Sequence, residues 1–167
     1  MEIKTNRLVI KSLSPFDRKG MIYLLNNKEI KKTYMIPDFN NEEESIVYFN
    51  KLLTIPNDEK HYLCGVYLNN KIIGMVNDVF IKDKEIELGY FIDPVYWKNG
   101  YATEVLKAMI NTMFELGYTR VITGYFEENP ASGRVMQKCG MTPIEQVDYI
   151  TYQDKKHKCL YYEIRNK

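Results

Sequence analysis

The sequence predicts an α/β (α+β) fold in which helices flank one mixed, mostly antiparallel sheet. Runs that alternate polar and apolar residues, as strands with one buried face do, occur near the N-terminus, in the middle and at the C-terminus. Between them lie segments whose apolar residues recur at helical spacing, most clearly residues 102–113. The 167 residues are 45% hydrophobic, which is enough apolar material for one sizeable core. We therefore expect a single domain over residues 1–167.

The first third of the chain predicts a strand followed by two helices. Residues 6–11 alternate and predict the first strand. Ser14 and Pro15 supply an N-cap and a first-turn proline for a short helix that stops at the Asn-Asn pair 26–27. A second helix is expected from residue 42 to about residue 53, because its apolar residues fall at helical spacing.

Two features of this region leave alternatives open. The connector 31–40 is aromatic and contains proline without a clear period, so it forms either a packed lid or a loop that covers the core. Glu42, Glu43 and Glu44 begin the second helix. They either attract a cation or an amine, or simply stabilise the positive end of the helix dipole, as acidic first turns ordinarily do.

The middle of the chain predicts an antiparallel meander. Residues 61–68 and 71–80 flank the Asn-Asn pair 69–70, which indicates a hairpin. A third β-type run, residues 85–92, follows a polar turn.

A helix then connects two strands that should run parallel. The amphipathic segment 102–113 ends near Gly117, a residue suited to the C′ position. Residues 119–125 predict the next strand. Because a helix joins this strand to the run 85–92, the connection resembles a βαβ crossover and implies locally parallel neighbours.

The C-terminal segment predicts a helix and a closing hairpin. Asn129 is the expected N-cap, followed by a first-turn proline, and Gly140 ends the helix. The last alternating runs, residues 144–152 and 157–164, predict two paired strands around a polar turn at 154–156.

Composition excludes several classes of function. Lys and Arg number 23 against 22 Asp and Glu, a formal charge of +1, which gives no overall attraction to nucleic acid or an anionic membrane. Residues 1–10 lack a continuous apolar core, so we expect neither a signal peptide nor a membrane span there. Cys64, Cys139 and Cys159 are odd in number and widely spaced, which favours buried thiols in a reducing cytoplasm over disulfides or a catalytic nucleophile. We expect no metal site.

The segment 93–104 has the chemistry of an anion-binding loop. It follows a predicted strand and opens a helix, whose first N–H groups have no intrahelical acceptor and whose dipole adds partial positive charge. Gly100 permits a positive φ and a close approach of a ligand to the backbone, and Ala102 keeps the first turn small. The spacing matches neither a P-loop nor a dinucleotide fingerprint.

This loop resembles the acyl-CoA pyrophosphate loop of the GNAT superfamily of N-acetyltransferases, Gln/Arg-x-x-Gly-x-Gly/Ala. Trp97, Gly100 and Ala102 occupy the first, fourth and sixth places, and Trp97 departs from the usual Gln or Arg. The longer wording is similar to the branch containing the ribosomal-protein N-terminal-alanine acetyltransferases. Residues 129–141 also resemble the superfamily segment Asn-x-x-Ser-x-Arg/Lys-x-x-x-Lys-x-Gly-Phe/Met, and residues 5–10 resemble the opening strand of that branch.

The resemblance implies a sheet with a splayed parallel pair and an N-acetyltransferase that uses acetyl-CoA as co-substrate. The expected reaction is direct attack by a primary amine, for which a protein N-terminus is one candidate, in a ternary complex. A small amine such as a polyamine, an amino sugar or an aminoglycoside is the alternative acceptor. In this family the connection between the first two helices walls the acceptor site, so an acidic wall from the Glu42–Glu44 cluster would favour polycations. A non-catalytic CoA-binding module is the alternative from another class.

Candidate catalytic residues follow from the chemistry and from the resemblance. An amine with a pKa of about 10 is protonated at pH 7, so a general base is useful. Glu85 and Glu87 share one face of their strand, and Glu87 lies nearer the loop, so it is the better candidate, although a surface carboxylate is an equal reading. By resemblance, Ser132 assists the departing thiolate and Asn129 binds the pantetheine.

The resemblance also assigns the rest of the acetyl-CoA site. The backbone of Phe91 and Ile92 should pair with the pantetheine as an added strand. The pyrophosphate should be bound by amides of the loop, with a charge-assisted contact from the lysine: Lys98, Asn99, Gly100, Tyr101, Ala102 and Thr103.

The closing segment is rich in tyrosine. We expect these side chains to be exposed and to form an edge able to pair with a second copy of the chain, as a homodimer, although tyrosine is also common on ordinary half-buried strands. The residues are Tyr149, Tyr152, Tyr161 and Tyr162.

Overall fold

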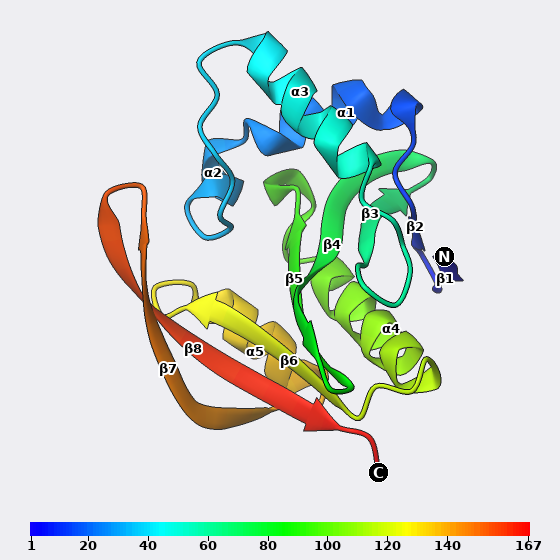
Figure 1. Cartoon of the computed structure of the whole chain (residues 1–167), viewed down its shortest axis with the longest axis vertical. Coiled ribbons are helices and arrows are strands. Elements are labelled where there is room, and N and C mark those ends of the chain that lie inside the picture. Colours follow the sequence, from blue (N-terminus) through cyan, green and yellow to red (C-terminus); the bar gives the residue numbers. More distant parts are fainter. The chain divides into compact units, whose positions relative to one another are not determined.

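The structure is a computed structural model that describes all residues from 1 to 167. It contains one sheet in the order β1-β2-β3-β4-β5-β6-β8-β7, in which β5 and β6 form the parallel pair (Figure 1). The strands are β1 Glu2–Lys4, β2 Val9–Lys11, β3 Leu63–Leu68, β4 Lys71–Lys82, β5 Glu85–Ile92, β6 Arg120–Phe126, β7 Thr142–Tyr152 and β8 Lys155–Arg165. The helices are α1 Arg18–Leu25, α2 Lys28–Lys31, α3 Glu42–Leu53, α4 Tyr101–Glu115 and α5 Pro130–Lys138, with short 3-10 turns η1 Pro15–Asp17 and η2 Pro94–Tyr96. The predicted fold class is confirmed.

The chain packs as two compact units. The first comprises Met1–Asn77 and Tyr90–Val105, and the second comprises Asp78–Gly89 and Leu106–Lys167. Strands β4 and β5 and helix α4 each contribute residues to both units. The expectation of one domain over residues 1–167 stays a prediction.

The first unit is built around an apolar core beneath α1 and α3, which lie against each other (Figure 1). Met21 and Leu24 from α1 and Phe49 from α3 are almost fully buried in it. On the sheet side, Met75 of β4 and Phe91 of β5 belong to the same core. One face of each helix therefore lies in the core, as the helical spacing of the apolar residues predicts.

Two elements of the first unit were missed in the sequence. Strand β1 pairs antiparallel with β2, and the one-turn helix α2 follows α1 directly. Asn27, read as part of a stop signal, is the N-cap of α2, where its side chain accepts hydrogen bonds from the backbone N–H groups of Glu29 and Ile30. A residue that ends one helix can therefore begin the next.

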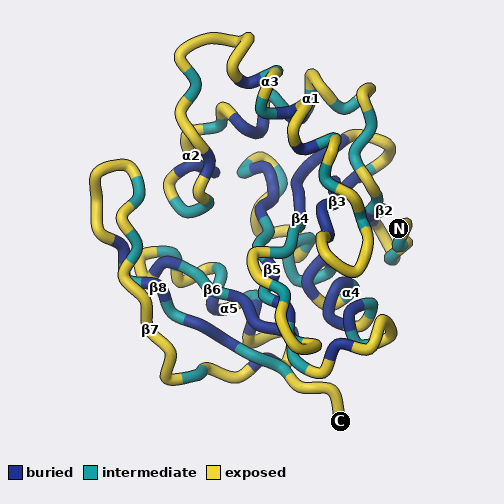
Figure 2. The backbone as a smooth tube through the Cα atoms, viewed as in Figure 1, coloured by how far each residue is buried: buried dark blue, intermediate teal, exposed yellow.

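The second unit contains the parallel pair and the long closing hairpin β7–β8 (Figure 1). Pairing between β5 and β6 consists of three residue pairs, Glu85–Glu87 with Arg120–Ile122, although both strands continue further. This short parallel pairing agrees with the splay that the resemblance implies. Strand β7 is exposed along most of its length, whereas much of β8 is buried (Figure 2).

Each of three hairpins turns through two residues with positive φ, as type I′ turns do. The predicted turn at 154–156 is therefore one residue too late. The turns are Asn69-Asn70, Asp83-Lys84 and Gln153-Asp154.

Helix α4 ends as predicted at Gly117. This glycine has φ +93°, its N–H donates to the carbonyl of Phe114, and the N–H of Tyr118 donates to the carbonyl of Met113. Both bonds belong to the Schellman motif, which needs a residue with positive φ at this position. None of the helices combines the length and the apolar character needed to cross a membrane.

Candidate active site

The loop after β5 is anchored at its first residue. Asp93 is 2% exposed, and its backbone N–H donates to the carbonyl of Ile73 on β4 at 2.7 Å. Its carboxylate accepts a hydrogen bond from the N–H of Val95 at 3.2 Å, which caps η2. One hydrogen bond therefore fixes the start of the loop to the sheet, and a second one holds the turn that follows.

Trp97 ties the middle of the loop back to the strand. Its indole Nε1–H donates to the carbonyl of Ile92 at 2.7 Å, while the side chain remains 48% exposed. The Asn99 amide donates to the carbonyls of Tyr96 and Trp97 at 3.0 Å each. The residue that departs from the usual Gln or Arg thus acts as a donor within the loop.

The loop opens into α4 with the geometry expected of an anion site. Lys98 and Gly100 have φ values of +63° and +78°. The carbonyl of Gly100 accepts the N–H of Glu104 at 3.0 Å, so Gly100 is the residue at which helical hydrogen bonding begins. The N–H groups of Tyr101 and Ala102 then have no intrahelical acceptor, which is the arrangement that holds phosphate oxygens.

The backbone of Phe91 and Ile92 is partly engaged within the chain. A Cβ atom on Gly74 would overlap the carbonyl oxygen of Phe91, so that carbonyl faces β4. The carbonyl of Ile92 accepts the indole of Trp97. Because backbone groups alternate in direction along a strand, the N–H of Ile92 faces away from β4 and is the group better placed for an added strand. Pairing of pantetheine with these residues stays a prediction.

The two carboxylates on β5 in the second unit lie in different environments. Glu85 accepts a hydrogen bond from Arg120 Nη1 at 2.9 Å, and Arg120 also pairs with Glu163. Burial raises the pKa of the Glu87 carboxyl, and the nearby negative charge of Asp148 raises it further. A raised pKa brings a carboxylate closer to the range useful for a general base.

The neighbours of Glu87 come from β7 and β8. The pKa of Asp148 is lowered because its carboxylate accepts hydrogen bonds, first from the Gln146 amide, at 3.0 Å, and then from the Tyr161 hydroxyl. Burial raises the pKa of Tyr161, which keeps this phenol as a donor. Cys159 lies beside the same groups. Glu87 therefore lies next to a charged carboxylate that is itself held by two donors.

Backbone features make room for this cluster. Tyr161 pairs with Gly124 across β6 and β8, and a Cβ atom on Gly124 would lie 2.6 Å from the tyrosine ring. In β7, the pairing shifts between Ile144 and Val147, a bulge that includes Gln146. The sequence reading missed Asp148 and Tyr161, because only the pairing of distant strands brings them to Glu87.

Asn129 and Ser132 lie together at the start of α5, as predicted, but Asn129 does not cap the helix with its side chain. Its amide Nδ2 donates instead to the Ser132 hydroxyl oxygen at 3.1 Å. Because the oxygen accepts this bond, the hydroxyl proton of Ser132 can be donated elsewhere.

The acidic start of α3 serves the helix itself. Glu44 accepts from the backbone and side chain of Asn40, which lowers its pKa, and its N–H is capped by Asn41. The connector before α3 is packed, since Ile36 is 2% exposed and the Tyr34 ring meets Phe91 edge-on at 4.8 Å between centroids. Both observations favour the ordinary structural readings.

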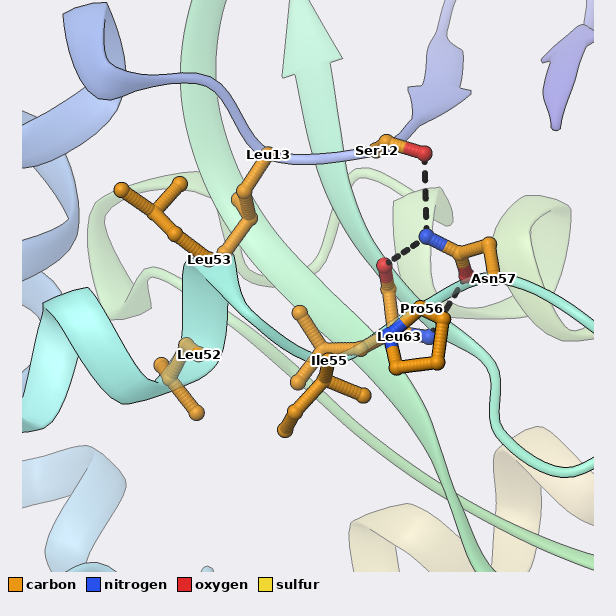
Figure 3. A pocket seen from close by; sticks show the side chains of 8 residues that line it. All are labelled: Ser12, Leu13, Leu52, Leu53, Ile55, Pro56, Asn57 and Leu63. Atoms are coloured by element: carbon orange, nitrogen blue, oxygen red, sulfur yellow. Dashed lines mark hydrogen bonds between the residues drawn. The ribbon is translucent and has the colours of Figure 1, made fainter.

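The first unit also contains a small cavity that is separate from the predicted site residues. It has a volume of about 240 Å³ and is bordered by Leu52 and Leu63, with Asn57 as its main polar side chain (Figure 3). The Asn57 amide donates to Ser12 and to the carbonyl of Leu63 and accepts from the Leu63 N–H. It contains none of the predicted site residues, and its polar group is engaged in holding the chain.

The three cysteines are buried and none forms a disulfide. Burial raises the pKa of the Cys64 and Cys139 thiols to about 11 each and also raises that of Cys159. These thiols stay protonated at neutral pH, as expected of structural cysteines and not of a nucleophile. No group of three or more His, Cys, Asp or Glu side chains is placed to hold a metal ion.

Comparison with known proteins agrees with this geometry. The family described as "Acetyltransferase (GNAT) domain" matches residues 7–142. A Bacillus subtilis (strain 168) protein, "Uncharacterized N-acetyltransferase YnaD", is 30% identical over 145 residues, 84% of this chain and 82% of that protein.

Solved structures share the fold over nearly the whole chain. The microcin C7 self-immunity acetyltransferase MccE, in complex with acetyl-CoA and AMP, gives a TM-score of 0.85 at 19% identity, covering 97% of this chain and 94% of that chain. The ribosomal L7/L12 alpha-N-protein acetyltransferase RimL, in complex with coenzyme A, gives 0.80 at 16% identity, covering 99% and 98%.

The fold and the family match define the class of this protein as an acetyltransferase. The chain belongs to the GNAT family and is an acetyl-CoA-dependent N-acetyltransferase. The alternative of a non-catalytic CoA-binding module is therefore set aside.

Proposed function

We propose that this enzyme acetylates the N-terminal amine of a protein, by direct attack on acetyl-CoA in a ternary complex with Glu87 as the general base. The observation that carries the proposal is the environment of Glu87, where burial and Asp148 raise the pKa of a carboxylate. Resemblance to the ribosomal-protein branch and the shared fold of RimL support a protein N-terminus as the acceptor.

Each group has a distinct role in this proposal. Acetyl-CoA supplies an activated thioester. Glu87, directly or through water, accepts the proton that the amine must lose before or during attack. The loop amides from Lys98 to Thr103 hold the pyrophosphate, with the Lys98 ammonium adding charge. The Asn129 amide binds pantetheine, and the Ser132 hydroxyl donates to the departing thiolate.

A small cationic amine is the second candidate acceptor. Asp148 places a second negative charge beside Glu87, which would attract a polyamine or an aminoglycoside as well as an α-amine.

A thiol-release assay over two sets of acceptors distinguishes the candidates. CoA released from acetyl-CoA is measured with peptides that differ in their first residue and with small amines, after subtraction of hydrolysis. We expect kcat/KM to be highest for a subset of peptides. Uniformly higher kcat/KM for polyamines or aminoglycosides would overturn the protein N-terminus and favour the second candidate.

Ser132→Ala should lower kcat by about tenfold, on the scale of one hydrogen bond to a charged group, because the departing thiolate loses a donor. Since this role concerns the sulfur and not the amine, the loss should be similar at neutral and at high pH. Rates measured from pH 7 to pH 10 check this expectation. A variant with unchanged kcat would leave Ser132 only its contact with Asn129.

We also propose a homodimer through the exposed edge strand β7, but not through all of the tyrosines named in the sequence. Tyr161 and Tyr162 are buried, at 6% and 7% exposure, on opposite faces of β8. Tyr161 belongs to a core cluster of the second unit, and the Tyr162 hydroxyl accepts a hydrogen bond from Gln137 of α5. Val147 and Tyr149, at 40% and 62%, are the exposed apolar residues on β7. An unpaired edge strand can pair with another chain. Light scattering should give the mass of a dimer, and a monomer at high micromolar concentration would contradict it.

The cytoplasmic location expected from the three thiols also remains a proposal. It agrees with thiols that are buried and unbridged.

A further inference from the structure

Arg7, in the turn between β1 and β2, contacts both the proposed acetyl-CoA loop and the first turn of α4. Its Nε and Nη2 lie 2.7 Å from Glu104 Oε2, and its backbone N–H donates to Glu104 Oε1 at 2.9 Å. Its Nη1 donates to the carbonyl of Asn99 at 2.8 Å, and its guanidinium lies 4.4 Å from the centre of the Tyr101 ring. One side chain thus holds the loop and the first turn of α4 together.

The contact between Arg7 and Glu104 is the one that bears on phosphate binding. Glu104 lies in the first turn of α4, beside the N–H groups proposed to hold the pyrophosphate. Although burial alone would raise it, the pKa of Glu104 is lowered by hydrogen bonds from Thr5, at 2.6 Å, and from Arg7. Its carboxylate is therefore charged at neutral pH, and an uncompensated charge there would repel phosphates.

The position of the guanidinium also restricts Gly100. Nη2 lies 3.5 Å from the point that a Cβ atom on Gly100 would occupy. Arg7 therefore packs against the side of Gly100 on which a side chain would lie.

We propose that Arg7 is a positioning residue for acetyl-CoA, which fixes the loop through Asn99 and neutralises Glu104 so that the helix N-terminus accepts the pyrophosphate. This inference rests on the proposed acetyl-CoA loop. It differs from direct phosphate binding by Arg7, because the guanidinium acts through a carboxylate and a backbone carbonyl. Removing the carboxylate should then offset the loss of the arginine.

The test measures CoA binding by calorimetry and acetyl-CoA kinetics in four variants. Arg7→Met should raise the Kd for CoA and the KM for acetyl-CoA by about tenfold or more, on the scale of hydrogen bonds to charged groups, with kcat changed less than about twofold. Arg7→Met/Glu104→Gln should recover most of this loss. Glu104→Gln alone should bind CoA at least as tightly as wild type. Arg18→Met, which removes the same charge from an exposed position on α1, should bind as wild type.

The outcomes separate the inference from the proposed site. A wild-type chain that binds no CoA overturns the site and this inference with it. A wild type that binds, together with an Arg7→Met that binds equally well, overturns only the inference. A double variant as weak as Arg7→Met shows that Arg7 does not act by neutralising Glu104, and also overturns the inference. If Arg7→Met does not fold by thermal denaturation, Glu104→Gln decides alone, because a tenfold loss of affinity there contradicts the neutralising role.

Discussion

Glu87→Gln should lower kcat at pH 7 by about 10²-fold or more, in conditions where chemistry and not product release limits the rate. Glutamine keeps the size and much of the hydrogen bonding of Glu87 but does not accept a proton. The loss should shrink as the pH rises towards the pKa of the amine, because more acceptor then arrives neutral. Rates of wild type and variant, measured across this range with a peptide acceptor, give the comparison.

Two further variants make this result specific. Glu85→Gln alters the other carboxylate on the same strand face, which is paired with Arg120, and should change kcat little. Asp148→Asn removes the charge that helps to raise the pKa of Glu87, so the acid limb of the wild-type pH profile should move to lower pH. A Glu87→Gln enzyme with wild-type kcat at pH 7 would return Glu87 to a surface role and leave proton transfer to a water chain or to another carboxylate.

Glu87→Gln should lower activity but should not lower the stability of the folded chain. Because the pKa of Glu87 is raised in the folded chain, the folded state binds more protons than the unfolded state between the ordinary carboxyl pKa and the raised value. The free energy of unfolding therefore falls as the pH rises through that window, and the cost persists at neutral pH. Glu87→Gln removes this cost, so its Tm at pH 7 should equal or exceed that of wild type.

Gly100→Val should weaken CoA binding by about 2 kcal/mol or more, on the scale of lost hydrogen bonds to a charged group. At φ +78° a β-branched residue is strained, and its Cβ would lie in van der Waals contact with Arg7 Nη2, at 3.5 Å. The loop should therefore shift its amides away from the phosphate. Calorimetry with CoA measures the effect.

Gly117→Val is the matched control for backbone strain. Gly117 also has a positive φ, +93°, but a Cβ there has no neighbour within 4 Å, and the residue lies at the other end of α4. This variant should lose stability to a similar extent and keep the wild-type affinity for CoA. Unchanged affinity in a folded Gly100→Val chain would remove the loop from the binding site.

Local chemistry made much of the fold predictable. Helix α3 runs from Glu42 to Leu53 as its spacing predicts, and the Asn69-Asn70 pair turns the first hairpin. Glycine also marks the end of α4, because the C′ position requires a positive φ, which a single glycine satisfies. Where a feature depends on neighbours within one or two turns, the sequence was sufficient.

The environment of the candidate site was not predictable in the same way. Asp148 meets Glu87, and Arg7 meets Glu104, across 61 and 97 positions of sequence respectively. Such contacts depend on strand order and register, which periodicity does not determine. Tyr161 was read as exposed for the same reason, since alternation along β8 does not say which face the sheet buries.

The single tryptophan of the chain is Trp97, and it is half exposed in the loop after β5, with its indole hydrogen-bonded to the end of that strand. Its emission therefore reports one place in the molecule without any label. A ligand that pairs with the N–H of Ile92 lies beside this hydrogen bond, so CoA titrations followed by intrinsic fluorescence should sense the loop itself. The same signal, recorded by stopped flow, would time loop engagement separately from acetyl transfer.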